Sequence, residues 1–406
     1  MVELKPGWRR VKLGDAVQRH VERVDTIDDY RYFVGVDALD SETLRLRRWG
    51  RIGHDEIPPT FRFAFRQGMV LFPTRRPRLR KCAIAPFSGL TGEKVLVLQP
   101  LINGILFPPL AAFILSSLRV QEWAIKCEIG SVTPHFRWND LAQCEIALPP
   151  FEEQLRYSEA LSAAEMAYQA VCDLASTASC AADAFAAAAF RGEGRRDMRA
   201  HPRLGLVSSD WPVVTIGDVT ESSQYGLSTV PQEAGRYPLL RMMNIVDGCV
   251  VENDLRYIDL SDDSFSAYHL ENGDVLFNRT NSIELVGRTG VYTLEGEHVF
   301  ASYLVRIKVK CATVSPEYLT AYLNAPLGRQ QVLSFATKAV SQANVSASNL
   351  AKVLMPLPPR DIQDRIVADL LRLKQAQHQA MERAQQVAII RRSILQDLTG
   401  PVEASQ

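Results

Sequence analysis

A short sequence that recurs after about half of the chain constrains how this chain can fold. LPPFEEQLRYSEAL at residues 148–161 returns as LPPRDIQDRIVADL at residues 357–370, an interval of 209 in a chain of 406 residues. Three more blocks repeat in the same order: Trp8–Val17 with Trp211–Thr220, Gly68–Arg76 with Gly273–Asn281, and Ser131–Pro150 with Val340–Pro359. The offset varies from 203 to 209, so the insertions fall between blocks, as loops do. The sequence therefore predicts two similar halves.

The first 150 residues of each half have the pattern of a mixed α/β domain. Short runs rich in Val, Ile, Phe and Tyr alternate with Gly, Pro, Asn and Asp, and this pattern predicts strands. The runs are VGVDAL, MVLFPT, KVLVLQP, VLFNRT, GVYTL and FASYLVRIKVK. Residues 110–126 and 315–336 have a helical pattern, and in the second of these Ser315 is the expected N-cap with Pro316 at the first helical position. We expect domains at residues 1–150 and 211–359, joined through a linker at 193–210.

Each half ends in a proline-free segment that predicts a long helix, at residues 151–192 and 360–400, followed by a tail at 401–406. From Ile366 to Leu398, apolar and small residues recur in steps of four and three, the spacing of a coiled-coil seam. Half of the positions 209 residues earlier are alanine. The seam residues singled out are Leu161, Tyr168, Phe185, Ile366, Leu370, Leu373 and Ile394. Each helix would be roughly 60 Å long, and the pair is expected to be antiparallel because the chain must return.

The resulting fold class is α+β, with two similar mixed domains separated by two antiparallel helices in a pseudo-two-fold internal repeat. A dimerisation stalk or an intramolecular brace is the alternative interpretation of the helices.

Several function classes are disfavoured by the sequence. No apolar run approaches the roughly 18 residues that cross a bilayer, and the N-terminus lacks the apolar core of a signal peptide. The seven cysteines never occur as CxxC, which disfavours a metal site or a disulfide framework and favours the cytoplasm. No nucleotide-binding, hydrolase or metalloprotease motif is present. We therefore expect no catalytic and no metal-binding residues.

The net charge of zero conceals an uneven distribution. Residues 1–150 contain 22 Lys and Arg against 16 Asp and Glu, whereas residues 211–355 contain 11 against 15. Most of the basic surplus lies in residues 31–81, with 12 against 5. Phosphate binding needs local positive potential rather than a basic whole. The alternative is an ordinary solvated basic face.

Four polar loops at paired positions predict recognition of nucleic acid. Arginine, amide and hydroxyl side chains are the groups that contact phosphates and base edges. The loops FPTRRPRLRK and FNRTNS occupy equivalent places in the two halves, as do TPHFRW and SQANVS. The candidate DNA-binding residues are Thr74, Arg75, Arg76, Arg78, Arg80, Lys81, Thr133, His135, Arg137, Asn278, Arg279, Thr280, Asn281, Ser341, Gln342 and Asn344. Taken singly, such residues are more often ordinary turn residues.

The chain resembles the specificity subunits of type I restriction–modification systems. The resemblance rests on the repeated LPPFEEQ and LPPRDIQ phrases, on VLFNRTNS followed by VGRTGVY and FASYLVR, and on SPEYLTAYLNAPLGR with SQANVSASNLAKVLMPLPP. It departs from the usual signature in the second half, where Asp361 and Ile362 replace the two glutamates, although Gln363 is kept.

This resemblance implies two target-recognition domains that read a bipartite site on double-stranded DNA, with a helical coiled coil setting the spacer. It also implies partners: two methyltransferase subunits and, in some assemblies, restriction subunits with translocase activity. S-adenosylmethionine, ATP and Mg would belong to those partners, and the setting would be the prokaryotic cytoplasm. Because the paired loops differ, we expect an asymmetric site. The alternatives are a methylation-only or phage-exclusion assembly, a protein-interaction scaffold, and a stand-alone enzyme of unusual sequence.

Overall fold

The computed structural model describes residues 4–338 and 342–399, which divide into two compact units. The first unit is formed by described residues of Met1–Cys172 and Met381–Gln406, and the second unit is Asp173–Ala380. Each unit therefore holds the start of one long helix and the end of the other.

Among the described residues, the first unit contains three small sheets. Its strands are β1 (Arg9–Lys12), β2 (Val17–His20), β3 (Tyr32–Val34), β4 (Gly50–Arg51), β5 (Phe61–Phe65), β6 (Val70–Pro73), β7 (Ala83–Ile84), β8 (Gly89–Gly92), β9 (Val95–Pro100) and β10 (Glu145–Leu148). Its short helices are α1 (Leu13–Ala16), α2 (Ala111–Ser116), α3 (Leu118–Lys126) and α4 (Trp138–Leu141). The sheets have the orders β2-β9-β6-β7 and β4-β3-β8-β5, and β1 pairs with β10.

The second unit has a larger main sheet. Its strands are β11 (Met198–His201), β12 (Gly205–Ser208), β13 (Val213–Thr215), β14 (Thr220–Tyr225), β15 (Tyr237–Leu240), β16 (Ile245–Val246), β17 (Cys249–Val250), β18 (Arg256–Ile258), β19 (Val275–Asn278), β20 (Thr280–Asn281), β21 (Thr289–Val291), β22 (Val299–Phe300), β23 (Leu304–Val309), β24 (Thr337–Lys338), β25 (Ala343–Asn344) and β26 (Leu354–Pro356). Its short helices are α6 (Ile216–Val219), α7 (Asp262–Tyr268), α8 (Pro316–Asn324), α9 (Pro326–Ser334) and α10 (Ala347–Leu350). The main sheet has the order β14-β23-β19-β21-β17-β16.

The sequence repeat is present in the sheet topology. The order β2-β9-β6 in the first unit corresponds to β14-β23-β19 in the second, and the pair β1-β10 corresponds to β13-β26. The register corresponds as well: Val70 pairs with Leu98, and its equivalent Val275 pairs with Ile307. The repeated blocks therefore form the same three-stranded core, and the loops that follow β6 and β19 leave it at the same point.

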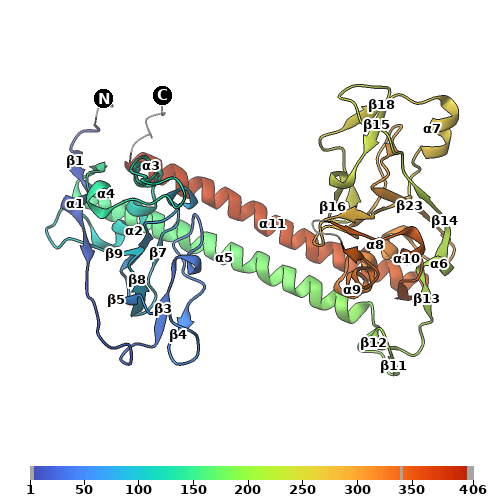
Figure 1. Cartoon of the computed structure of the whole chain (residues 1–406), viewed down its shortest axis with the longest axis horizontal. Helices are drawn as coiled ribbons and strands as arrows, with labels where there is room; N and C mark the ends of the chain where they lie inside the picture. Colours follow the sequence, from blue (N-terminus) through green and yellow to red (C-terminus); the bar gives the residue numbers. More distant parts are fainter. Residues whose placement is uncertain (1–3, 339–341, 400–406) are drawn as a thin grey trace. The chain divides into compact units, whose positions relative to one another are not determined.

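Two long unbroken helices contribute to both units (Figure 1). They are α5 (Phe151–Ala189, 39 residues) and α11 (Arg360–Thr399, 40 residues). In the first unit, Tyr157 bonds to Asp397 and Glu165 to Arg391, so early residues of α5 meet late residues of α11. The segments therefore run antiparallel in that unit. All ten positions of each expected seam are buried or half-buried: Tyr157, Leu161, Ala164, Tyr168, Val171, Ala175, Ala178, Ala182, Phe185 and Ala189 on α5, and Ile366, Leu370, Leu373, Gln377, Ala380, Ala384, Val387, Arg391, Ile394 and Leu398 on α11.

A buried glutamine fixes the start of each long helix. Gln154 accepts a hydrogen bond from the backbone N–H of Phe107 (2.7 Å) and donates to the carbonyls of Ile105 and Pro149 (both 3.0 Å). Gln363 makes the corresponding bonds, with the N–H of Ser315 (3.0 Å) and the carbonyls of Thr313 (3.0 Å) and Pro358 (2.9 Å). Both side chains are fully buried. This explains physically why the glutamine recurs in both phrases, since an amide supplies the acceptor and two donor hydrogens that these backbone groups need.

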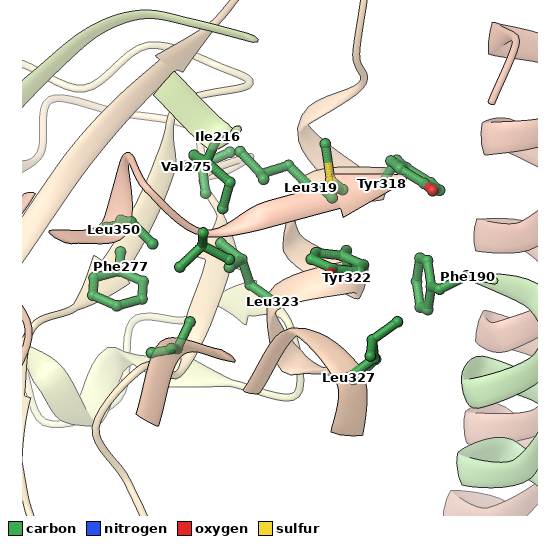
Figure 2. Close-up of a cluster of buried hydrophobic side chains, with 14 of the residues drawn as sticks. Phe190, Ile216, Val275, Phe277, Tyr318, Leu319, Tyr322, Leu323, Leu327 and Leu350 are labelled. Atoms are coloured by element: carbon green, nitrogen blue, oxygen red, sulfur yellow. The ribbon is translucent and has the colours of Figure 1, made fainter. Parts of the chain in front are cut away.

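The main core of the second unit receives the end of α5 (Figure 2). Phe190 is fully buried and packs edge-on against Tyr318 (5.4 Å between ring centroids) and Tyr322 (5.3 Å) of α8. Burial raises the pKa of both tyrosines well above the usual value. Phe277 of β19 lies in the same cluster, so the strand that leads to the polar loop at residues 278–282 is anchored in this core.

Three sequence expectations need correction. The strand expected at 34–39 ends at Val34, and Val36–Ala38 forms a 3₁₀ turn. The helix expected at 110–126 is interrupted by Ser117, which is extended and caps α3 by accepting from the N–H of Val120. The helix expected at 315–336 begins as predicted but is interrupted at Ala325, because Pro326 disfavours a helical conformation in the residue before it.

Residues 193–210, assigned to a linker from the sequence, contain the hairpin β11-β12. Leu204 and Val207 of this segment are buried in the main core of the second unit. The apolar side chains of the hairpin therefore make it part of that unit.

Candidate nucleic-acid interface

In the first unit, the loop after β6 lies against the loop that precedes α4. Arg75 and His135 form an antiparallel bridge, and the N–H of Arg76 donates to the carbonyl of Pro134 (2.9 Å). Thr74 is buried and donates through both its N–H (2.9 Å) and its hydroxyl (3.2 Å) to the carbonyl of Lys94. The fold thus brings together two of the loops singled out in the sequence, TRR at 74–76 and TPHFR at 133–137.

These loops border a basic hollow. Its lining includes Arg19, Arg75, Lys94, Thr133, His135 and Arg137, with Glu93 as the acidic member. Within the described ranges 4–338 and 342–399, no ion pair involves the exposed side chains of Arg19, Arg75 or Arg137. The hydrogen bond and charge of Lys94, with a smaller contribution from Arg75, hold the pKa of Glu93 below its usual range. The hollow therefore has a surplus of positive charge that faces solvent.

The remaining cations of the same segment have partners inside the first unit. Arg78 pairs with Glu128 at 3.1 Å, and Arg80 pairs with Glu122 of α3 at 2.5 Å. Lys81 donates to the carbonyl of Val36 (3.3 Å). Arg78, Arg80 and Lys81 therefore have contacts within the first unit that stabilise the segment. Arg75 and Arg76, by contrast, remain exposed.

In the second unit, Arg279 is the centre of the equivalent cluster. Its guanidinium lies 4.7 Å from the ring centroid of Tyr225, which is 42% exposed. It donates to the side-chain carbonyl of Asn344 (3.4 Å), and the amide of Asn344 donates to the hydroxyl of Thr280 (2.7 Å). Thr280 and Asn344 are also paired across strands β20 and β25. Arginine, amide and hydroxyl groups are thus held side by side at half-exposed positions.

The other candidates of the second unit are placed differently. Asn278 is fully buried, and both polar atoms of its amide lack a hydrogen-bond partner among the residues described. Asn281 donates to the sulfur of Met242 (3.2 Å) and accepts from the N–H of Ser282 (2.8 Å). Gln342 is exposed. Ser341 lies outside the described residues.

The two clusters occupy corresponding positions but differ in chemistry. Each joins the loop after β6 or β19 to the segment before the short helix α4 or α10. The sequence analysis missed Arg19, Lys94 and Tyr225, which come from β2, from the turn before β9 and from β14. No local signal marks these residues, because β2 and β14 reach the clusters through the strand order of the folded sheet, which is not visible in a sequence.

Within residues 4–338 and 342–399, no group of three or more His, Cys, Asp or Glu is arranged to hold a metal ion. Of the helices formed by those residues, none is long and apolar enough to span a membrane.

The fold and the paired clusters define a duplicated protein with two differently equipped polar surfaces on a common scaffold. Residues 208–387 match the family described as the type I restriction modification DNA specificity domain. The match agrees with the resemblance found in the sequence over these residues.

Individual proteins agree with this assignment. The chain is 30% identical over 146 residues to the specificity subunit of the type I restriction enzyme EcoKI of Escherichia coli K12. That match covers 35% of this chain and 31% of the relative, so it spans less than a third of the relative's length.

Solved structures extend the likeness of fold to nearly the whole chain. The S subunit of the type I restriction-modification system of M. genitalium has a TM-score of 0.58 at 12% identity, with 99% of both chains covered. A chain from a structure of the assembly of the type I R-M system also has a TM-score of 0.58, at 22% identity, with 99% of this chain and 100% of that chain covered. At these identities the likeness concerns the fold.

Proposed function

We propose that this chain is the DNA-specificity subunit of a type I restriction–modification assembly and reads a bipartite, asymmetric sequence on double-stranded DNA. The observation that carries the proposal is the pair of polar clusters at corresponding places of a duplicated sheet. Duplicated positions support a common partner, and different side chains support different sequences for the two half-sites.

The chemistry of each cluster suits DNA. The exposed guanidinium groups of Arg75 and Arg137 suit phosphate oxygens or, in the major groove, the O6 and N7 atoms of guanine. Arg279 is held over Tyr225 and beside Asn344, so its orientation is set before any ligand arrives. A guanidinium whose orientation is already fixed should bind a base edge more tightly, because less rotamer freedom is lost on binding.

In this proposal the two long helices form the spacer between half-sites. Two linked binding modules gain affinity only when the connection lets both engage at once, and helices of 39 and 40 residues are stiffer than a tether. Deleting residues 370–373 together with residues 161–164 should shorten the recognised spacer. An unchanged spacer would rule out this role.

The chemistry of modification and cleavage is assigned to other polypeptides. We propose two methyltransferase subunits as partners, with restriction subunits in some assemblies, acting in the prokaryotic cytoplasm. S-adenosylmethionine, ATP and Mg would be bound by those partners, and no residue of this chain is assigned a catalytic role.

Genome-wide methylation mapping with and without this chain tests the proposal. We expect one asymmetric bipartite motif to lose methylation when the chain is deleted. A palindromic motif would contradict the use of two different clusters. Protection of a specific duplex by the methyltransferase alone would leave this chain as a scaffold, and methylation without cleavage in the complete assembly would identify a modification-only system.

A further inference from the structure

A carboxylate lies among the cations of the basic hollow in the first unit. Glu93 is exposed and lines the hollow together with Arg19, Arg75, Lys94 and Arg137. Its negative charge repels phosphate oxygens and so opposes the attraction that the surrounding cations exert on a DNA backbone. The hydrogen bond and charge of Lys94 lower the pKa of the Glu93 carboxyl, so that it stays ionised at neutral pH. Phosphate binding therefore gives no reason for a carboxylate at this place.

The fold gives no reason for this carboxylate either. Glu93 forms an ion pair with Lys94, its neighbour in the chain, at 2.7 Å, and the two side chains are 56% and 44% exposed. Ion pairs between exposed side chains contribute little to stability. The turn that carries both residues is held through its backbone, because the carbonyl of Lys94 accepts from the N–H (2.9 Å) and the hydroxyl (3.2 Å) of Thr74. The position of Glu93 is thus fixed while its side chain faces solvent.

The second unit has the same turn with different side chains. Residues 302–303, Ser-Tyr, directly precede β23 just as residues 93–94, Glu-Lys, directly precede β9. The strand registers on either side correspond, and the carbonyl of residue 303 accepts from the N–H of Arg279 (3.0 Å) as that of residue 94 accepts from Thr74. These backbone contacts do not depend on the side chains of the turn. The duplicated turn can therefore present a carboxylate to one polar cluster and hydroxyl groups to the other.

We propose that Glu93 is a specificity-determining residue that accepts a hydrogen bond from the N4 amino group of a cytosine in the half-site bound by the first unit. In the major groove cytosine offers this donor, whereas guanine offers the acceptors N7 and O6 and thymine offers O4. Adenine has an amino group, but its N7 acceptor lies beside it and would face the second oxygen of the carboxylate. The ion pair with Lys94 leaves room for the amino group, because a carboxylate has about four acceptor positions. This inference rests on the proposed function.

Glu93→Ala tests the role of the carboxylate, and Glu93→Gln tests its chemistry. The assay titrates the full chain, assembled with methyltransferase subunits, against duplexes in which one base pair of a half-site is changed at a time. Glu93→Ala should lower the preference for a C·G pair at one position by roughly 5- to 140-fold and leave the preferences at other positions unchanged. Its affinity for duplexes without the site should rise, because a charge that repels phosphate is removed. Glu93→Gln should bind an A·T pair at that position more tightly than the wild type does, because an amide pairs with both N6 and N7 of adenine.

Glu56→Ala is the matched control, because Glu56 is an exposed glutamate of the first unit outside the residues that line the hollow. It should keep every base preference of the wild type. A Glu93→Ala complex that keeps every base preference, or whose affinity changes by the same factor on all duplexes, would overturn the inference alone. Loss of preference at a position occupied by an A·T pair would overturn it as well. A wild-type complex without any base preference would overturn the proposed function and the inference with it.

Discussion

Replacement of Arg279 by alanine tests whether the second cluster reads a base. The guanidinium of Arg279 is half-buried, lies over Tyr225 and is bonded to Asn344. If it contacts a guanine edge, its loss should cost about 1–3 kcal/mol. At about 1.4 kcal/mol for each factor of ten, this is a loss of affinity of roughly 5- to 140-fold.

The structure also predicts an order of effects within the cluster. Tyr225→Leu removes the ring that orients the guanidinium but leaves the guanidinium itself, so its cost should be about 0.5–1 kcal/mol, the usual size of an exposed cation–π contact. Arg279→Ala should therefore be the more severe change, and Tyr225→Leu should weaken the same half-site.

The assay is a titration of the assembled complex against duplexes in which each half-site is altered separately. Arg279→Ala should bind the intact duplex and the duplex altered in its own half-site equally, while it still discriminates at the other half-site. Arg75→Ala, in the first unit, is the matched control. It should lose discrimination at the half-site of the first unit and keep it at the half-site of the second. An equal loss on every duplex, with a weaker dependence on salt, would mean that Arg279 contacts phosphate and would refute base reading.

Other predictions concern stability and the division of roles among the cations. Phe190→Ala should destabilise the second unit by about 3–5 kcal/mol, because the ring is fully buried against two tyrosines. Denaturant unfolding measures this change, and a loss of unfolding free energy as small as that of a substitution at an exposed site would contradict the packing. Gln363→Leu should cost about 1–3 kcal/mol for each buried backbone group left unpaired, and a neutral result would show that water replaces the amide. Hydrogen bonds from Lys5 and Tyr157 hold the pKa of Asp397 below its usual range, so its contribution to stability is complete above the unfolded pKa and is lost as the pH falls through the folded pKa. The difference in melting temperature between wild type and Asp397→Asn should therefore shrink below about pH 4, and a constant difference would exclude the ionic contribution. Arg78→Ala should change DNA affinity less than Arg75→Ala, because Arg78 is paired with Glu128; equal effects would place both on the DNA.

Local sequence signals were sufficient to predict the helices whose ends are determined by residues close by in the chain. The long helices lie close to the expected 151–192 and 360–400 because the Pro-Pro pairs, the absence of further proline and the heptad spacing all act within a few residues. Ser315 caps α8 as predicted for the same reason. Elements whose local signals conflict were predicted less well: the helical composition of 110–126 did not reveal that Ser117 interrupts it.

The composition of each polar cluster depended on contacts between residues far apart in the chain. Five cations in one short segment are indistinguishable by sequence, yet Arg78 and Arg80 are engaged by acidic residues on and after α3 while Arg75 and Arg76 face solvent. Tyr225 reaches Arg279 only because β14 and β19 both pair with β23. The repeat and its periodicity by themselves determined that there are two domains with long helices. Which charges remain available for a ligand was decided by strand order and by long-range ion pairs, because a charge is free or engaged according to its neighbours in space.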